Sequence, residues 1–152
     1  PFINPYLTPG DRYCIFEIEG WKCGILICYD NNIIENINTP NIEVLIINDN
    51  KLTKINNYKY LEYLDASNNM IKNINNMPRL NHLSILNNNL DELDNLPQLE
   101  YLNCRNNPII KIPYFDKLEL LACDTNKISK HYNDKITSLT KIYNDYIVYL
   151  KK

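Results

Sequence analysis

Apolar and polar positions along most of this chain follow a regular 19-residue period. The pattern reads L-x-x-L-x-L-x-x-N-x-L, with other apolar residues at some leucine positions. It begins, without insertion or deletion, at Ile42, Leu61, Leu80, Leu99 and Leu118. A fixed internal period of this length indicates a solenoid, in which each repeat buries its apolar side against its neighbours. The chain of 152 residues is long enough for one such domain.

The repeat at residues 61–79 illustrates how each unit should fold. Its inward-facing apolar residues are expected to be Leu61, Leu64, Ala66, Ile71, Ile74 and Met77. Tyr63, Asp65 and Ser67 alternate with inward positions, which is the spacing of a β-strand. One short strand per repeat should pair in parallel with the next, about 4.8 Å away. The return segment is too short for the helix of a usual crossover, so we expect it to be extended or tightly turned.

The asparagine of the pattern recurs where each strand should end and the chain should turn. The five positions are Asn50, Asn69, Asn88, Asn107 and Asn126. A sharp turn inside the fold leaves backbone groups without partners, at a cost of about 1–3 kcal/mol for each buried group. Because an asparagine side chain both donates and accepts hydrogen bonds, these five should form a buried ladder that links the repeats.

These residues resemble the leucine-rich-repeat family over residues 42–128, and the register can be extended back to residue 23. The resemblance implies an α/β, β-rich, right-handed solenoid with short parallel strands on its concave face. It also implies recognition of another protein through that face. We divide the chain into an N-terminal cap at 1–41, five repeats at 42–130 and a C-terminal cap at 131–152.

The C-terminal cap is predicted to be an amphipathic helix. After Ile128, apolar residues recur at helical spacing, namely Ile136, Leu139, Tyr143, Tyr146, Ile147 and Leu150. A solenoid needs a cover over its last repeat, and we expect a helix over 134–150 to supply it. The alternative is a helix that binds a partner or a membrane surface.

The N-terminal cap is predicted to contain a β-hairpin. In residues 12–28, two β-rich runs flank Glu19–Gly20–Trp21, which is typical of a hairpin turn. Continuing the 19-residue register backwards places pattern residues at Cys23, Leu26, Cys28, Asn31 and Ile33. Residues 23–41 would then be a sixth, degenerate repeat, and the strand at 12–18 would pair antiparallel to it and cover the sheet edge.

The segment TPGDRYCIFEIEGWKCGILICYDNNIIEN also resembles the nitrilase, or carbon–nitrogen hydrolase, superfamily around its nucleophile, over about residues 6–36. The resemblance implies that Cys28 would attack a nitrile or amide carbon. The family also needs a glutamate and a lysine well upstream, and the sole upstream lysine, Lys22, lies too close to Cys28. A thiol without an activating group is a poor nucleophile. We therefore assign no catalytic residue and interpret this strand pair as a cap of hydrolase-like origin.

The outward strand positions are the candidate binding surface. They form three columns: Val44, Tyr63, His82, Tyr101, Leu120; Ile46, Asp65, Ser84, Asn103, Ala122; and Asn48, Ser67, Leu86, Arg105, Asp124. An acidic edge runs beside them through Glu43, Glu62, Glu100 and Glu119. Because tyrosine and arginine are frequent interface anchors, the candidate partner-binding residues are Tyr63, His82, Tyr101, Arg105, Asp65, Glu62 and Glu100. The alternative, that the aromatic residues only shield the sheet, stays open.

Composition narrows the remaining functions. A net charge of −2 gives no general case for nucleic-acid binding, and no apolar run reaches the roughly 18 residues of a membrane span. The five cysteines are odd in number and widely spaced, unlike a disulfide framework. Cys104 and Cys123 should be buried neighbours, with oxidation or metal binding as the alternative. His82 and His131 lack metal-ligand spacing, and we expect no metal or cofactor.

We therefore expect a non-enzymatic, intracellular, cytoplasmic protein that binds another protein on its concave sheet. The glutamate edge should steer a partner that carries positive charge. Two alternatives remain: a nitrilase-like hydrolase, or its remnant, with Cys28 as nucleophile, and a structural spacer in a larger assembly. The sequence leaves the partner and the oligomeric state open.

Overall fold

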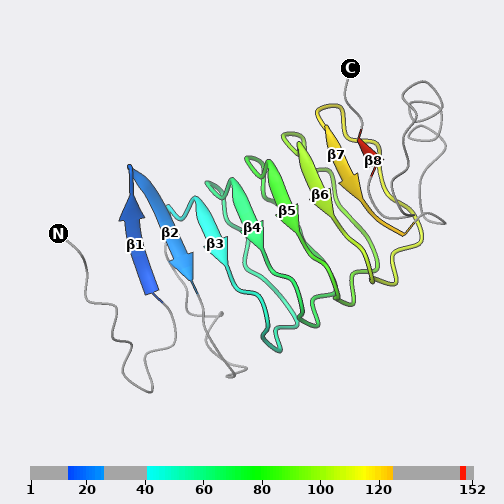
Figure 1. The fold of residues 1–152 in the computed structure, drawn as a ribbon, viewed down its shortest axis with the longest axis horizontal. Coiled ribbons are helices and arrows are strands. Elements are labelled where there is room, and N and C mark those ends of the chain that lie inside the picture. The colour runs from blue at the N-terminus through cyan, green and yellow to red at the C-terminus, as the bar shows by residue number, and fades with distance from the viewer. Residues whose placement is uncertain (1–13, 26–40, 125–147, 150–152) are drawn as a thin grey trace.

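The computed structural model describes residues 14–25, 41–124 and 148–149, which form one sheet of eight strands in chain order (Figure 1). The strands are β1 (Cys14–Ile18), β2 (Trp21–Ile25), β3 (Val44–Ile46), β4 (Tyr63–Asp65), β5 (His82–Ser84), β6 (Tyr101–Asn103), β7 (Leu120–Ala122) and β8 (Val148–Tyr149). Between β3 and β7 the chain leaves the sheet after each strand and returns to form the next. The winding is that of a solenoid.

Strands β3 to β7 pair in parallel, and every pair follows the 19-residue period of the sequence. Tyr63 pairs with His82, for example, and His82 with Tyr101. The predicted inward residues of the repeat at 61–79 are all at most 1% exposed. The prediction of one short parallel strand per repeat, with an apolar interior, is therefore confirmed. Burial of each such side chain contributes about 1.5–3 kcal/mol, which is why the apolar positions control the fold.

The return segments are extended and turned, as predicted, and no helix occurs in residues 41–124. They are tied to one another by backbone hydrogen bonds. The Met70 N–H donates to the Leu52 carbonyl at 2.8 Å, and the Asn89 N–H donates to the Ile71 carbonyl at 3.0 Å. These bonds pair polar backbone groups that the narrow repeat would otherwise leave without partners.

The N-terminal hairpin is also present. Strand β1 pairs antiparallel with β2, and the turn between them is formed by Glu19 (φ 51°) and Gly20 (φ 87°). Two successive positive φ values are typical of the tight turn that suits the twist of a two-stranded hairpin. Strand β2 then pairs in parallel with β3, so the hairpin joins the sheet of the repeats.

The register between β2 and β3 differs from the prediction. Cys23 pairs with Val44 and Gly24 with Leu45, which is a 21-residue offset in place of the 19-residue period. The placement of Cys23 at the position equivalent to Ile42 is therefore wrong. A shift by two positions keeps the same strand face inward, and Gly24 takes a position where the repeats have leucine. A Cβ atom on Gly24 would lie 2.5 Å from Cδ1 of Ile42, so the glycine makes room for the buried Ile42 side chain. The other residues of the predicted degenerate repeat lie outside the described residues: Leu26, Cys28, Asn31 and Ile33.

The C-terminal end differs from the predicted helix over 134–150 as well. Val148 and Tyr149 form the short strand β8, which pairs antiparallel with β7. Residues 125–147 lie outside the described part of the chain. A strand forms at this place because β7 presents backbone N–H and C=O groups at the edge of the sheet, and an extended segment can pair with them. Both ends of the parallel sheet therefore carry an antiparallel strand.

Candidate functional site

Three aromatic rings from successive repeats lie against one another on the outward side of the sheet. Tyr63, His82 and Tyr101 occupy paired positions in β4, β5 and β6. The ring centroids of Tyr63 and His82 are 4.3 Å apart, and those of His82 and Tyr101 are 3.9 Å apart. The interplanar angles are 13° and 0°. The rings form one continuous group, which we call the aromatic stack.

Polar side chains beside the aromatic stack are held by hydrogen bonds to one another. Oδ1 of Asp65 accepts from the backbone N–H of Ser67 at 3.1 Å. The hydroxyl groups of Ser67 and Ser84 lie 2.8 Å apart, and Nε of Arg105 donates to Oδ1 of Asn103 at 3.1 Å. These contacts cross from repeat to repeat or join neighbouring columns. The polar groups next to the rings are therefore held in place by hydrogen bonds within the protein.

The environment of the aromatic stack favours the uncharged forms of Tyr63 and His82. Burial raises the pKa of Tyr63, and the charge of Asp65 and the neighbouring Tyr101 raise it further. Burial lowers the pKa of His82, and Asp65 opposes this shift only in part. A neutral imidazole between two phenol rings can accept and donate hydrogen bonds but carries no charge. The surface is thus suited to apolar and hydrogen-bonding contacts more than to acid–base chemistry.

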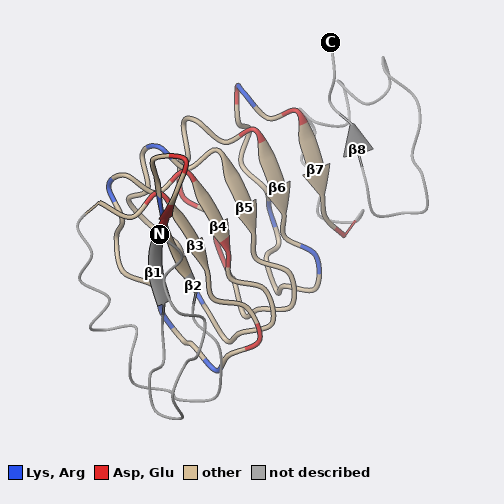
Figure 2. Cartoon of the chain, turned by 60° about the vertical axis from the view of Figure 1, so that its left-hand side comes forward, with Lys and Arg blue, Asp and Glu red and all other residues tan. Residues whose placement is uncertain are grey.

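The predicted glutamates do lie along one edge, each directly before a strand. The Glu62 N–H donates to the Glu43 carbonyl, and the Glu119 N–H donates to the Glu100 carbonyl, both at 2.8 Å. Acidic residues just ahead of β6 and β7 are visible in Figure 2. The column of residues two positions before the glutamate column contains two cationic side chains, Arg79 and Lys117. The edge therefore has mixed charge, a feature that the glutamate spacing alone did not indicate.

The pattern asparagines of three successive repeats share one set of hydrogen bonds, which we call the inner ladder. Nδ2 of Asn69 donates to the carbonyl of Ile47 in the preceding repeat at 2.9 Å and to the carbonyl of Ala66 in its own repeat at 3.1 Å. Its Oδ1 accepts from the Leu52 N–H at 3.0 Å. Asn88 and Asn107 make the equivalent bonds.

The inner ladder has an open end at Asn50. Its Nδ2 donates to the carbonyls of Ile47 and Asn48, but among the described residues its buried Oδ1 has no hydrogen-bond partner. In the other repeats this oxygen bonds to the repeat before it. Asn50 is thus the position where the described repeat-to-repeat bonding begins. Asn126, the fifth predicted member, lies outside the described residues.

A second ladder of asparagines, which we call the outer ladder, runs along the exposed side of the same turns. Nδ2 of Asn68 donates to Asp49, that of Asn87 to Asn68 and that of Asn106 to Asn87, over 2.6–2.8 Å. All four residues have φ values of 53–58°, a conformation that asparagine and aspartate tolerate better than most residues. The sequence analysis did not predict the outer ladder, although the Asp-Asn or Asn-Asn pair at each repeat was a usable signal for it.

Three cysteine thiols are buried: Cys23, Cys104 and Cys123. Burial and the charge of Glu43 raise the pKa of the Cys23 thiol, which makes it a weaker nucleophile. Cys28, the nucleophile implied by the hydrolase resemblance, lies outside the described residues, as does His131. Within the described residues, no group of three or more histidine, cysteine, aspartate or glutamate side chains is placed to hold a metal ion.

Fold and surface together define a solenoid repeat protein with a parallel sheet. No protein-family model, curated protein or solved structure matches the chain. None of the described segments is a helix with the length and apolar character needed to cross a membrane.

Proposed function

We propose that this chain is a leucine-rich-repeat protein that binds another protein through the outward face of its sheet. The observation that carries the proposal is the aromatic stack of Tyr63, His82 and Tyr101. Aromatic side chains bury a large area with few rotatable bonds, and they dominate many protein interfaces. Since these rings already pack against one another, little side-chain freedom remains to be lost on binding.

The charges around the aromatic stack indicate the kind of partner. Asp65 lies beside the rings, and Glu62 and Glu100 lie along the edge before the strands. A partner that places an apolar or aromatic group over the rings and a lysine or arginine near these carboxylates fits this surface. Such charge complementarity raises the association rate and selects among partners more than it raises affinity.

A comparison of two tyrosine variants tests the proposal. Partners captured from the native source are identified with the wild-type chain, and binding of each purified partner is then measured. The double variant Tyr63→Ala/Tyr101→Ala is expected to bind at least tenfold more weakly, since interface aromatics often contribute about 2 kcal/mol or more. Tyr114→Ala is the control, because Tyr114 is 41% exposed on a return segment, away from the strands.

Circular dichroism establishes that both variants are folded. If the double variant binds every captured partner as well as Tyr114→Ala does, the sheet face is not the binding surface. That result would favour the structural-spacer alternative, in which contacts are made elsewhere.

A further inference from the structure

The hairpin that caps the repeats ends the sheet at strand β1. In the strand order β1 comes first, and among the described residues it pairs only with β2 (Figure 1). An edge strand presents backbone N–H and C=O groups to which a further extended chain can bond. The hydrogen bonds of β2 determine which groups of β1 these are.

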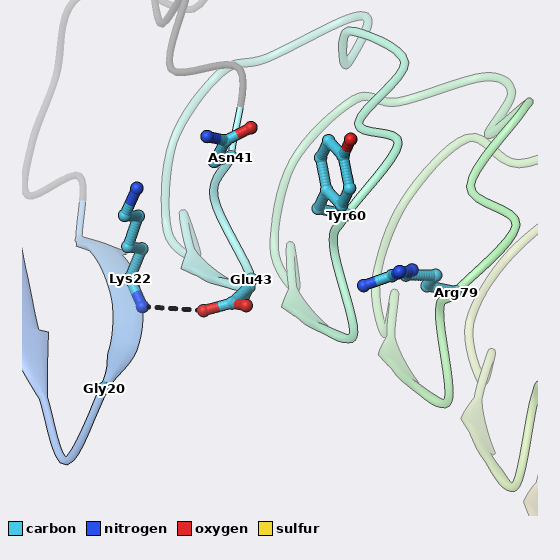
Figure 3. A pocket seen from close by; sticks show the side chains of 6 residues that line it. All are labelled: Gly20, Lys22, Asn41, Glu43, Tyr60 and Arg79. Carbon is cyan, nitrogen blue, oxygen red and sulfur yellow. Dashed lines mark hydrogen bonds between the residues drawn. The ribbon is translucent and has the colours of Figure 1, made fainter.

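The backbone of Lys22 in β2 bonds to the segment before β3. Its N–H donates to Oε2 of Glu43, the bond drawn in Figure 3, and its carbonyl accepts from the Glu43 N–H, both at 3.0 Å. Both groups therefore point away from Glu17, the residue opposite Lys22 in β1. Opposite residues of an antiparallel pair that do not bond to each other direct their N–H and C=O groups to the two outer sides. The backbone groups of Glu17, and of Ile15 two residues earlier, thus point to the outer edge of the sheet.

Two exposed apolar side chains lie at the turn end of the hairpin. Ile18 and Trp21 are directly opposite each other in the β1–β2 pair, so they lie on the same face of the sheet. They are 56% and 45% exposed. Contiguous exposed apolar groups, unlike single ones, are typical of interaction surfaces, and tryptophan is a frequent anchor in them.

The charge at this edge is negative. Glu17 and Glu19 are both exposed. Lys22 contributes its side chain to a pocket that extends from the hairpin turn to the segments before β3, β4 and β5 (Figure 3). The residues that line the pocket are Gly20, Lys22, Asn41, Glu43, Tyr60 and Arg79. A chain that pairs with β1 therefore meets the carboxylate of Glu17 on the outer strand.

We propose that the outer edge of β1 binds an extended segment of another protein that has a lysine or arginine between two apolar residues. The segment pairs antiparallel to β1, which is the slightly more stable arrangement, and adds a strand to the sheet. Its basic residue lies opposite Glu17 and exchanges backbone hydrogen bonds with it. Its apolar residues lie on the other face, which is that of Ile18 and Trp21. This edge is separate from the aromatic stack, and the proposal does not rest on the function of that stack.

A second copy of this chain fits the edge less well. Strand β1 reads CIFEI and contains no cation. Pairing of two β1 strands would place Glu17 opposite another Glu17 or opposite an uncharged residue. Because like charges directly opposite each other destabilise a sheet, a basic segment of a different chain is favoured.

Four short peptides test the proposal with the full chain at low salt. The first is acetyl-Thr-Val-Lys-Val-Thr-amide. The others replace its lysine by glutamate, replace both valines by serine, or carry a methyl group on the backbone nitrogen of the lysine. Emission of Trp21, the single tryptophan of the chain, reports binding. The lysine peptide should bind with a millimolar dissociation constant, and the other three about fivefold more weakly, since each lacks one cross-strand interaction.

Each peptide that lacks an interaction can overturn the proposal. If the glutamate peptide binds as tightly as the lysine peptide, Glu17 does not select a basic residue. If the methylated peptide binds as tightly, backbone pairing with β1 is not the mode of binding. If the serine peptide binds as tightly, the apolar face plays no part.

Variants of Glu17 test the predicted pairing of charges. Glu17→Gln should remove the preference for the lysine peptide over the glutamate peptide, and Glu17→Lys should reverse it. Glu92→Lys, which changes an exposed charge on a return segment, is the matched control and should keep the wild-type preference. Circular dichroism establishes that the variants are folded. A wild-type preference in both Glu17 variants would overturn the proposal.

Backbone amide hydrogen exchange locates the bound peptide. The lysine peptide should slow exchange most at Ile15 and Glu17, whose N–H groups point to the outer edge. The amides of Phe16 and Ile18, which point to β2, should change little. Strongest protection in β4 to β6 would overturn the proposal. Protection of Glu17 that appears without peptide as the protein concentration rises would also overturn it, since a second copy would then occupy the edge.

Discussion

Two kinds of junction join neighbouring parallel strands in this sheet. From β3 to β7 every pair keeps the 19-residue period, and Asn69, Asn88 and Asn107 of the inner ladder each bond their repeat to the one before it. Between β2 and β3 there is a 21-residue offset, and Gly24 takes the place of a leucine. The comparison shows that the sequence period determines the pairing register of two strands where both neighbouring repeats carry the full pattern. It does not determine the register where one of the two lacks the pattern.

The two junctions differ because an error in strand register would cost a different amount of folding free energy at each of them. In the central repeats a slip would break side-chain hydrogen bonds to buried backbone groups, at about 1–3 kcal/mol for each group. At the junction a shift by two positions leaves the same strand face inward, so the apolar alternation does not distinguish the two registers. Side-chain volume decides instead, because Gly24 leaves space for Ile42.

The largest effect is expected from breaking the inner ladder in the middle. Asn88→Ala leaves the Ile71 N–H without its acceptor and the Ala66 carbonyl without its donor from the next repeat. The Ala66 carbonyl keeps Nδ2 of Asn69 as a donor, but the buried Ile71 N–H has no other acceptor among the described residues, and the carbonyls of Ile85 and Leu86 lose the Asn88 donor as well. We therefore expect the free energy of unfolding to fall by about 3 kcal/mol. Equilibrium urea unfolding measures this loss.

Asn50→Ala is the matched comparison, since Oδ1 of Asn50 has no partner among the described residues. It should cost about 1 kcal/mol, less than Asn88→Ala. An equal loss for both variants would contradict the view that bonds between repeats, and not bonds within one turn, make the inner ladder stabilising.

The second largest effect tests the junction itself. Gly24→Ala places a methyl group against Cδ1 of Ile42 and should lower the free energy of unfolding by about 1–3 kcal/mol. Ile42→Val removes that carbon atom, so Gly24→Ala should cost less in the Ile42→Val background. Urea unfolding of the four proteins in this double-mutant cycle gives the coupling. A harmless Gly24→Ala substitution would argue against the observed pairing of Gly24 with Leu45.

A smaller effect is expected from the outer ladder. Asn87→Ala forces a residue that avoids positive φ into φ 53° and removes two exposed hydrogen bonds, and should cost about 1–2 kcal/mol. Asn87→Gly removes the same bonds but tolerates the backbone conformation, so it should cost less. Thermal unfolding compares the two. If glycine destabilises the chain as much as alanine, hydrogen bonding and not conformation makes asparagine favourable here.

The smallest effect is expected at the hairpin turn, and it has the opposite sign. Glu19 has φ 51° next to Gly20, a position that asparagine occupies more easily than glutamate. Glu19→Asn should therefore raise the free energy of unfolding by about 0.5 kcal/mol. Glu17→Asn, at an exposed position within β1, should give no gain. A gain at Glu17 equal to that at Glu19 would show that the turn conformation is not the cause.

The central repeats were predictable because several signals coincide in each of them. Leucine spacing, the strand alternation at Tyr63 and Asp65, and the recurring asparagine all specify the same winding. The offset of β2 was not predictable, because it depends on the space beside Ile42, which no local pattern reports. The strand at Val148 and Tyr149 was missed because the residues on either side of it, Ile147 and Leu150, fit a helical period, and pairing with the edge of β7 decides between strand and helix.

The candidate surface was predictable only as a set of residues. The period places Tyr63, His82 and Tyr101 in one column, but the parallel alignment of their rings depends on side-chain rotation and packing. The pocket at Lys22 and Arg79 could not be predicted, because it combines residues from two registers. A search for every column with a constant residue type would have found the outer ladder.

Neighbouring repeats are joined by hydrogen bonds between equivalent atoms. Because of this, a whole repeat can be removed without changing the kind of contact that remains, and the length of the molecule can be altered. Since each central repeat bonds only to its neighbours, stability in such arrays is close to a sum over adjacent pairs. Deleting residues 70–88 would join Asn69 to Asn89 in phase and shorten the sheet by one strand, about 4.8 Å. The deletion removes His82 and brings Tyr63 next to Tyr101. The reach of the aromatic stack can therefore be changed only in steps of one whole repeat.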